Sequence, residues 1–247
     1  MKVRIPFKFI TLILFLFSNE IKAQKDVTTF GFVMKPIFSS KYFRTGPTDI
    51  ADNGINFNLA QQSGFSAGGV LRWGLTKSLS FETGINYVKR NYQLKITDST
   101  STRKSDFKIF GYEVPLQALI FIQLSEDIWM NAALGPSIDM FPSDVSTSDD
   151  YFAQQSIRNS NTGVFNLGII ANLGWEWRTK KNGYIYLGAC YHRSFNDTYT
   201  TTIGYINDPK AKEPYAQVQT GLTGDYLTFD IRYYFHEDPE KKAKKKK

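Results

Sequence analysis

Six charged side chains are placed where they could act together, because each falls in a stretch in which apolar and polar residues alternate. Successive side chains of a strand point to opposite faces, so all six would lie on the polar faces of strands. Ionised groups held away from bulk water must pair with opposite charge. The pattern therefore predicts a buried ion-pair network. No two of the carboxylates have the spacing of a catalytic pair, so acid–base catalysis by them is not expected. The predicted network comprises Arg72, Glu82, Glu113, Glu176, Asp230 and Arg232.

One short motif suggests catalysis. His192 stands two residues before Ser194, which puts both side chains on one face of a strand, where a base could activate a hydroxyl. The motif is similar to the His-x-Ser of outer-membrane lipid A deacylases, but Phe195 stands where that family has asparagine. Alternation over residues 185–191 turns the pair toward the polar face. A structural histidine is the favoured interpretation, and a lipid A-modifying hydrolase is the alternative.

Other metal or cofactor chemistry has little support in the sequence. Asp144, Asp149 and Asp150 could offer oxygen ligands, but their spacing matches no calcium-binding loop. Cys190 is the only cysteine, which excludes an internal disulfide framework and a cysteine-rich metal site. No phosphate-binding glycine loop and no zinc signature is present. We expect no catalytic residue, no metal and no cofactor.

The two ends of the chain differ in composition from the rest. Residues 1–23 place basic residues before a short uncharged run and end on a small residue, which predicts a cleaved secretory signal peptide. Residues 236–247 are rich in lysine and predict a disordered tail. The signal peptide contributes +3 and residues 241–247 contribute +6 to the net charge of +7, which leaves −2. The body therefore lacks the basic surface of a nucleic-acid-binding protein.

The domain between these ends, residues 24–235, shows period-two alternation eight times. The connections alternate between short turns and long polar loops, and no later apolar run is long enough for a membrane-spanning helix. This order is typical of an all-β, eight-stranded antiparallel up-and-down transmembrane β-barrel with both termini in the periplasm. We expect strands at 27–38, 64–75, 79–96, 107–124, 128–140, 163–177, 183–197 and 222–235, and long outer loops at 39–63, 97–106, 141–162 and 198–221.

Aromatic residues gather near the predicted short turns, as they do at a membrane interface. The predicted periplasmic girdle comprises Trp73, Trp129, Trp175, Trp177, Tyr184, Tyr233 and Tyr234. A weaker outer belt is expected at Tyr92, Tyr112, Phe141, Phe165, Tyr199 and Tyr226.

Three prolines, Pro36, Pro115 and Pro136, fall inside predicted strands. Each removes a hydrogen-bond donor from the ladder, so a bulge or a local break is expected at each.

Two of these prolines belong to segments through which the chain resembles a known family. Tyr112-Glu113-Val114-Pro115-Leu116, Ala133-Leu134-Gly135-Pro136, much of residues 68–84 and Tyr233-Tyr234-Phe235 are similar to the PorT-like outer-membrane β-barrels of the Bacteroidota. The resemblance covers most of residues 25–235 and implies an outer-membrane barrel, in which Phe235 looks like the barrel-assembly signal. Some members serve type IX protein secretion, a role that the resemblance does not assign to this chain.

The sequence as a whole favours a non-enzymatic, monomeric barrel with a plugged polar lumen, exported to the bacterial outer membrane. Its expected partners are outer-membrane lipids and proteins of the envelope or of a secretion system, with no nucleic acid. A narrow solute channel is the first alternative, because a polar lumen could also conduct, although eight strands enclose a space that side chains fill. The hydrolase based on His192 and Ser194 is the second alternative.

Overall fold

The computed structural model describes residues 27–40, 43–76, 78–158, 164–179, 182–208, 210 and 213–235. The predicted signal peptide and lysine-rich tail lie outside these residues. No described part of the chain forms a helix with the length and hydropathy that crossing a bilayer requires.

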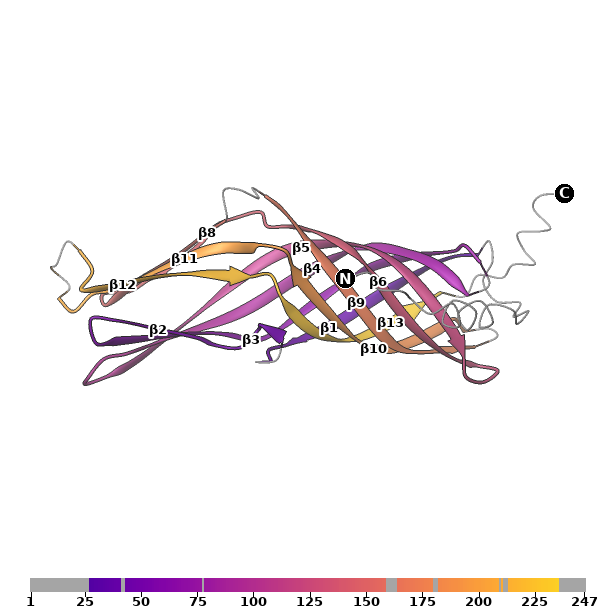
Figure 1. The fold of residues 1–247 in the computed structure, drawn as a ribbon, viewed down its shortest axis with the longest axis horizontal. Coiled ribbons are helices and arrows are strands. Elements are labelled where there is room, and N and C mark those ends of the chain that lie inside the picture. Colours follow the sequence, from indigo (N-terminus) through magenta and orange to yellow (C-terminus); the bar gives the residue numbers. More distant parts are fainter. Residues whose placement is uncertain are drawn as a thin grey trace, which may run out of the picture.

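Eight of the described strands form a closed antiparallel ring (Figure 1). Neighbours follow the order β1-β13-β10-β9-β6-β5-β4-β3, and β3 pairs back with β1 from Thr28↔Trp73 to Ile37↔Gly64. The antiparallel barrel expected from the sequence is therefore confirmed. The ring strands are β1 (Thr28–Phe38), β3 (Ile55–Gly74), β4 (Leu79–Thr97), β5 (Thr102–Gln123), β6 (Ile128–Met140), β9 (Phe165–Arg178), β10 (Tyr184–Ser194) and β13 (Tyr226–Tyr234).

The ring is apolar outside and polar inside. Outward positions carry large exposed apolar side chains, such as Phe32, Ile85 and Leu134. Inward positions carry buried polar and charged side chains, such as Arg72, Glu82 and Asn131. A surface of this kind is unfavourable in water and suits a hydrocarbon environment.

The three strand prolines interrupt the ladder without shifting its register. Pairing of β1 with β13 skips Lys35 and Pro36 and resumes at Ile37↔Thr228. Comparable gaps lie beside Pro115 in the β4–β5 pairing and beside Pro136 in the β5–β6 pairing. The expected local break is thus confirmed at each proline.

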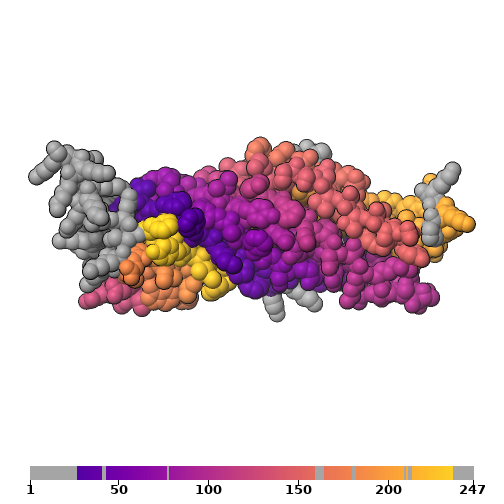
Figure 2. Space-filling model, turned by 180° about the vertical axis from the view of Figure 1, so that it is seen from behind, coloured from indigo at the N-terminus to yellow at the C-terminus, as the bar shows by residue number. Residues whose placement is uncertain are grey.

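The expected long loops are largely ordered strands, which corrects the sequence interpretation. Four further strands form a second antiparallel sheet in the order β12-β11-β8-β7. We call this sheet, β2 and the outer ends of β3, β4 and β5 (residues 55–62, 91–97 and 102–109) the extension. Figure 1 shows it at the left, prolonging the barrel, and Figure 2 shows the same elongated body from behind. The added strands are β2 (Thr48–Asp52), β7 (Val145–Ser148), β8 (Phe152–Arg158), β11 (Asp197–Tyr205) and β12 (Ala216–Thr223).

The extension has an apolar core of its own, which makes these segments fold. Side chains from β3, β4 and β5 pack against side chains from β8, β11 and β12. Burying an aliphatic or aromatic side chain contributes about 1.5–3 kcal/mol, enough in sum to order segments whose other face is polar. The buried members are Ile55, Phe57, Leu59, Tyr92, Leu94, Ile96, Phe107, Ile109, Phe141, Phe152, Tyr199, Ile203, Tyr205, Ala216, Val218 and Leu222.

Both faces of β5 change in polarity at the same position along the strand. In the extension, Lys104 and Lys108 are exposed while Phe107 and Ile109 are buried. Further along the strand, outward positions from 110 onward become apolar, and the inward position 113 carries a buried glutamate. The change marks where the surface suited to water ends and the surface suited to lipid begins.

The prediction of the aromatic girdle is wrong for three of its seven residues. Trp175, Trp177 and Tyr233 are exposed on the outward face, and Trp73 is half-buried there, as expected. Trp129, Tyr184 and Tyr234, by contrast, lie on the inward face; the first and last are 4% and 0% exposed, and Tyr184 packs against the cluster of Val70, Tyr186 and Tyr234.

Strand parity and cationic partners explain these inward positions. The ring of Tyr234 lies 3.9 Å from the guanidinium carbon of Arg72, and the ring of Trp129 lies 4.3 Å from that of Arg178. Aromatic faces stabilise such cations away from water.

The prediction of a weaker outer belt is wrong for four of its six residues, for a related reason. Tyr112 and Phe165 are exposed, but the other four side chains are buried. Three of them, Tyr92, Phe141 and Tyr199, belong to the core of the extension, and Tyr226 packs with Ile37 and Val88 inside the ring.

Candidate functional site

The predicted ion-pair network exists and crosses the lumen. Arg72 donates to Glu82 (3.0 Å) and to Glu176 (2.6 Å). Arg232 joins Glu82 to Asp230, donating to Asp230 over 2.7 Å. Five of the six predicted residues are therefore linked directly, although they come from four strands of the ring.

Two cations that the sequence analysis did not single out complete this network. Lys35 Nζ lies 3.5 Å from Glu113 and 3.9 Å from Asp230, which connects the sixth predicted residue. Arg178 donates to Glu176 over 2.6 Å. Lys35 precedes a strand proline and Arg178 stands at a strand end, and alternation assigns a face least securely at such positions.

The network fills the lumen closely. Tyr234 donates a hydrogen bond to Glu82 over 2.7 Å, and Tyr186 donates one to Asn172. Two cavities among these side chains each measure about 10 Å³. Such a volume has room for about one water molecule.

The two members of the His-x-Ser motif do not form the contact that the alternative hypothesis of a hydrolase would require. Both His192 and Ser194 are buried on the lumen face, as predicted. The ring of His192 instead contacts Ser137 Oγ, Asp139 Oδ2 and the Gly224 carbonyl through its two nitrogens. The backbone N–H of Ser194 donates to Asp225 over 2.8 Å. Within the described residues, no hydrogen bond joins the imidazole to the Ser194 hydroxyl.

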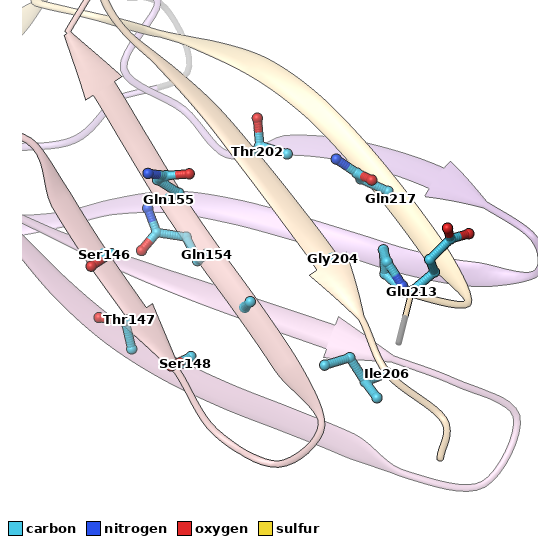
Figure 3. Close-up of a pocket in the computed structure, with 12 residues that line it drawn as sticks. Ser146, Thr147, Ser148, Gln154, Gln155, Thr202, Gly204, Ile206, Glu213 and Gln217 are labelled. Atoms are coloured by element: carbon cyan, nitrogen blue, oxygen red, sulfur yellow. The ribbon is translucent and has the colours of Figure 1, made fainter. Parts of the chain in front are cut away.

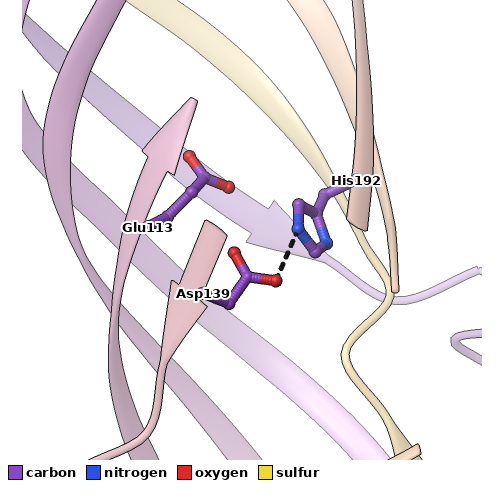
Figure 4. Close-up of side chains that lie close together, drawn as sticks. All are labelled: Glu113, Asp139 and His192. Atoms are coloured by element: carbon purple, nitrogen blue, oxygen red, sulfur yellow. Dashed lines mark ion pairs between the residues drawn. The ribbon is translucent and has the colours of Figure 1, made fainter. Parts of the chain in front are cut away.

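A different set of side chains is placed to hold an ion. One donor atom each from Glu113, Asp139 and His192 lies within 4.8 Å of the other two, and all three residues are buried (Figure 4). They come from β5, β6 and β10, and Glu113 is paired directly with Asp139 across two neighbouring strands. No sequence motif predicts this set, because it depends on cross-strand register.

The aspartates of the third long loop serve the extension's own structure. Asp144 accepts hydrogen bonds from the backbone N–H and the guanidinium of Arg158, which hold the pKa of Asp144 below its usual value. Asp149 accepts the backbone N–H groups of Tyr151 and Phe152 and so closes a turn.

A larger cavity of about 500 Å³ lies in the extension (Figure 3). It is lined mainly by hydroxyl and amide side chains of the second sheet and the segment that follows β11. Uncharged donors and acceptors of this kind suit recognition through hydrogen bonds. The lining comprises Ser146, Thr147, Ser148, Ala153, Gln154, Gln155, Thr202, Gly204, Ile206, Glu213, Pro214 and Gln217.

A closed antiparallel ring with an apolar exterior and a charged interior defines an integral outer-membrane β-barrel protein of bacteria. The chain belongs to the family described as outer membrane protein beta-barrel domain, whose model matches residues 23–200. A comparison with curated proteins finds no match at the sequence level.

One solved structure supports the same fold. The outer membrane protein OprG from Pseudomonas aeruginosa is similar, with 12% identity, a TM-score of 0.53, and coverage of 88% of this chain and 100% of that one. The outer membrane protease OmpT from Escherichia coli aligns at 8% identity over 85% of this chain and 94% of its own, with a TM-score of 0.33. At these identities the likeness to OprG concerns the fold alone.

Proposed function

We propose that this protein is a non-enzymatic, monomeric outer-membrane barrel that does not conduct and that uses its extension to bind a protein of the envelope or of a secretion system. The proposal includes export through cleavage after residue 23. The observation that carries it is the contrast between the two regions: the lumen holds linked ion pairs, whereas the cavity of about 500 Å³ lies in the extension.

Ion pairs that span the lumen support a closed interior. A solute would have to displace Arg72 and Arg232 from Glu82 while all three are withdrawn from water. Removing one partner of such a buried pair costs about 3–5 kcal/mol, so transient opening is rare.

Planar-bilayer recording tests this part of the proposal. The purified full chain should give no stable conductance step at either polarity, and a double variant, Arg72→Ala with Arg232→Ala, should give steps if it folds. Stable openings of the wild-type protein would favour the solute channel instead.

The second sheet supports the binding part of the proposal. Its outer strands, β7 and β12, are the edges of the sheet, and edge strands offer backbone donors and acceptors to an added chain. The polar cavity beside them supplies side-chain hydrogen bonds.

Affinity purification from the native outer membrane tests the binding site. Gln155→Arg places a charge in the cavity, and Asn56→Arg is the matched control, an exposed amide residue of β3 in the extension, outside the cavity and the edge strands β7 and β12. The first variant should lose a partner that the wild type and the control both retain. Equal recovery with both variants would exclude the cavity as the binding surface.

The hydrolase remains the competing hypothesis for the His192 region. Burial of both His192 and Ser194 and the pairing of His192 with Asp139 argue against access by a lipid ester. Mass spectrometry of lipid A from cells with the wild type and with Ser194→Ala should show the same acyl pattern. A difference in the acyl pattern would support the hydrolase.

Membership of the PorT-like group of the Bacteroidota is the finer family proposal. It is supported by the Tyr112–Leu116 segment, in which Glu113 joins the lumen network and Pro115 makes the ladder break. A phylogeny of small outer-membrane barrels should place the chain within that group, and a position in another group would contradict the proposal.

A further inference from the structure

We infer that Glu113, Asp139 and His192 form a binding site for one divalent transition-metal ion, with Zn²⁺ as the probe, on the lumen side of the barrel. The site shares Glu113 with the ion-pair network and does not depend on partner binding by the extension. Figure 4 shows the three side chains converging from β5, β6 and β10.

Two carboxylates face each other in this site at a high electrostatic cost. Glu113 and Asp139 are directly opposite on paired antiparallel strands and are 1% and 4% exposed. Like charges at such a position destabilise a sheet, and burial strengthens the repulsion. Lys35 lies near Glu113, whereas the ion pair that Asp139 forms among the described residues is with His192.

The hydrogen bond at Nδ1 of His192 determines that Nε2 is the ring nitrogen that would face an ion. Nδ1 lies 3.0 Å from the carbonyl oxygen of Gly224, and a carbonyl can only accept, so Nδ1 carries a proton. In the neutral ring Nε2 then carries a lone pair, toward which the Ser137 hydroxyl lies at 2.8 Å. A backbone carbonyl that accepts from one ring nitrogen is the usual outer partner of a histidine that ligates a metal through the other.

A buried carboxylate oxygen that accepts no hydrogen bond points into the same space. Asp139 Oδ2 is buried and accepts no hydrogen bond of acceptable geometry within the described residues, although it lies 2.9 Å from His192 Nε2. Two lone pairs at that separation repel unless a proton or a cation lies between or beside them. Two ligands of one tetrahedral zinc ion, each about 2.0–2.2 Å from the metal, lie about 3.3–3.6 Å apart, so the two atoms must separate by about 0.5 Å to admit the ion.

A glycine leaves the room that the ion needs. Gly168 of β9 lies between the strands that carry Asp139 and His192. A Cβ added there would lie 3.0 Å from His192 Nε2 and 2.8 Å from Ser137 Oγ. The cavity of about 10 Å³ lined by Glu113 and Asp139 can add a water ligand.

Ion binding requires small rearrangements among the neighbours. The Ser137 hydroxyl, 2.8 Å from Nε2, must release that nitrogen. Asn86 and Lys35 can stay on Oε1 of Glu113, while the Tyr226 hydroxyl, which donates to Oε2, must share or yield that oxygen. One imidazole with two carboxylates favours zinc or a similar transition ion over calcium or magnesium, which prefer all-oxygen sites.

Metal titration of the full chain tests the site. The protein is purified without a histidine tag, folded in detergent, stripped with chelator and titrated with Zn²⁺ and with Co²⁺. We expect one equivalent per folded chain, with the visible absorption of Co²⁺ bound by nitrogen and oxygen. His192→Gln and Asp139→Asn should each weaken Zn²⁺ binding by roughly 100-fold or more, since outer partners alone contribute about 10–100-fold.

The chain supplies matched controls. His236→Gln removes the second of the two histidines, and Glu176→Gln removes a buried lumen carboxylate outside the site. Both should keep the single equivalent. Folding of every variant is checked by the heat-dependent shift in gel mobility that folded barrels show.

Two results would overturn the inference. One is a folded wild-type chain that takes up no stoichiometric metal. The other is a chain that loses the metal with His236→Gln but keeps it with His192→Gln. If a site variant fails to fold, X-ray absorption of the zinc-loaded wild type decides: one imidazole with oxygen ligands supports the site, and any set without imidazole refutes it.

Discussion

The barrel and the extension use the same strands with opposite interiors. Along β5 the buried side chains pass from Phe107 and Ile109 to Glu113, while the exposed ones pass from Lys108 to Phe110. Water drives apolar groups inward in the extension. Hydrocarbon removes that drive in the barrel, where the interior is held by paired charge and hydrogen bonds. One continuous strand can therefore belong to two kinds of core.

The largest expected effect comes from breaking the barrel's polar core. Arg72→Ala leaves Glu82 and Glu176 without a shared cation, and we expect a loss of about 3–5 kcal/mol in the free energy of unfolding. Urea titration in lipid vesicles measures it. Arg103→Ala is the control, an arginine of the extension stacked on Tyr151, for which about 1 kcal/mol is expected. Equal losses would contradict the assignment of distinct cores.

The extension should be separable from the barrel. Leu94→Ala removes a side chain that is 1% exposed in the apolar cluster and should cost the extension about 2–5 kcal/mol. Limited proteolysis should then cut β8, β11 and β12 while the ring stays intact. Ile120→Ala, at an outward position of the ring, should leave the extension resistant to the protease. Simultaneous loss of the ring would show that the two regions fold as one unit.

Substitutions of Trp129 and Trp175 should have different effects on stability, although both residues lie near short turns. Trp129→Leu removes the ring beneath the Arg178 guanidinium and should cost about 2 kcal/mol. Trp175→Leu should change stability little, because lipid accepts leucine at an exposed position. Brominated lipids should correspondingly quench Trp175 and spare Trp129. Efficient quenching of Trp129 would show that its side chain faces lipid and would contradict its inward position.

The smallest expected effect concerns the hydrogen bonds to Asp98 within the extension. A hydrogen bond from the Tyr205 hydroxyl, followed by the backbone N–H groups of Thr100 and Ser101, holds the pKa of Asp98 below its ordinary 3.8. A depressed carboxyl pKa contributes stability above 3.8 and loses it as the pH falls toward the folded value. The advantage of the wild type over Asp98→Asn should therefore be constant from neutral pH to about pH 5 and shrink below pH 4. A growing advantage under acid would contradict this.

The barrel could be predicted because its pattern is local. Alternation in residues 79–96 and 128–140 placed β4 and β6 within one residue of their observed bounds. The six network residues followed from the same parity. Lys35 was missed beside a proline, and Trp129 and Tyr234 were misplaced because composition near a turn was given more weight than parity.

The extension and the cluster of Glu113, Asp139 and His192 could not be predicted from alternation. Residues 141–162 and 198–221 look like polar loops because only one face is apolar and turn residues interrupt it. Their order depends on tertiary packing, as between Tyr199 of β11 and Phe141, which follows β6; the two ring centroids lie 5.6 Å apart. The approach of His192 to Asp139 depends on register across three strands.

Hydrogen exchange of the full chain in lipid bilayers tests the two-core account most directly. Backbone amides of β11 and β12 are paired in a sheet beyond the barrel and lie over an apolar cluster. They should exchange far more slowly than an unstructured peptide, and Leu94→Ala should speed their exchange while leaving β4 and β5 residues 79–90 and 110–123 protected. Exchange of the β11 and β12 amides at the unstructured rate in the wild type would contradict the account.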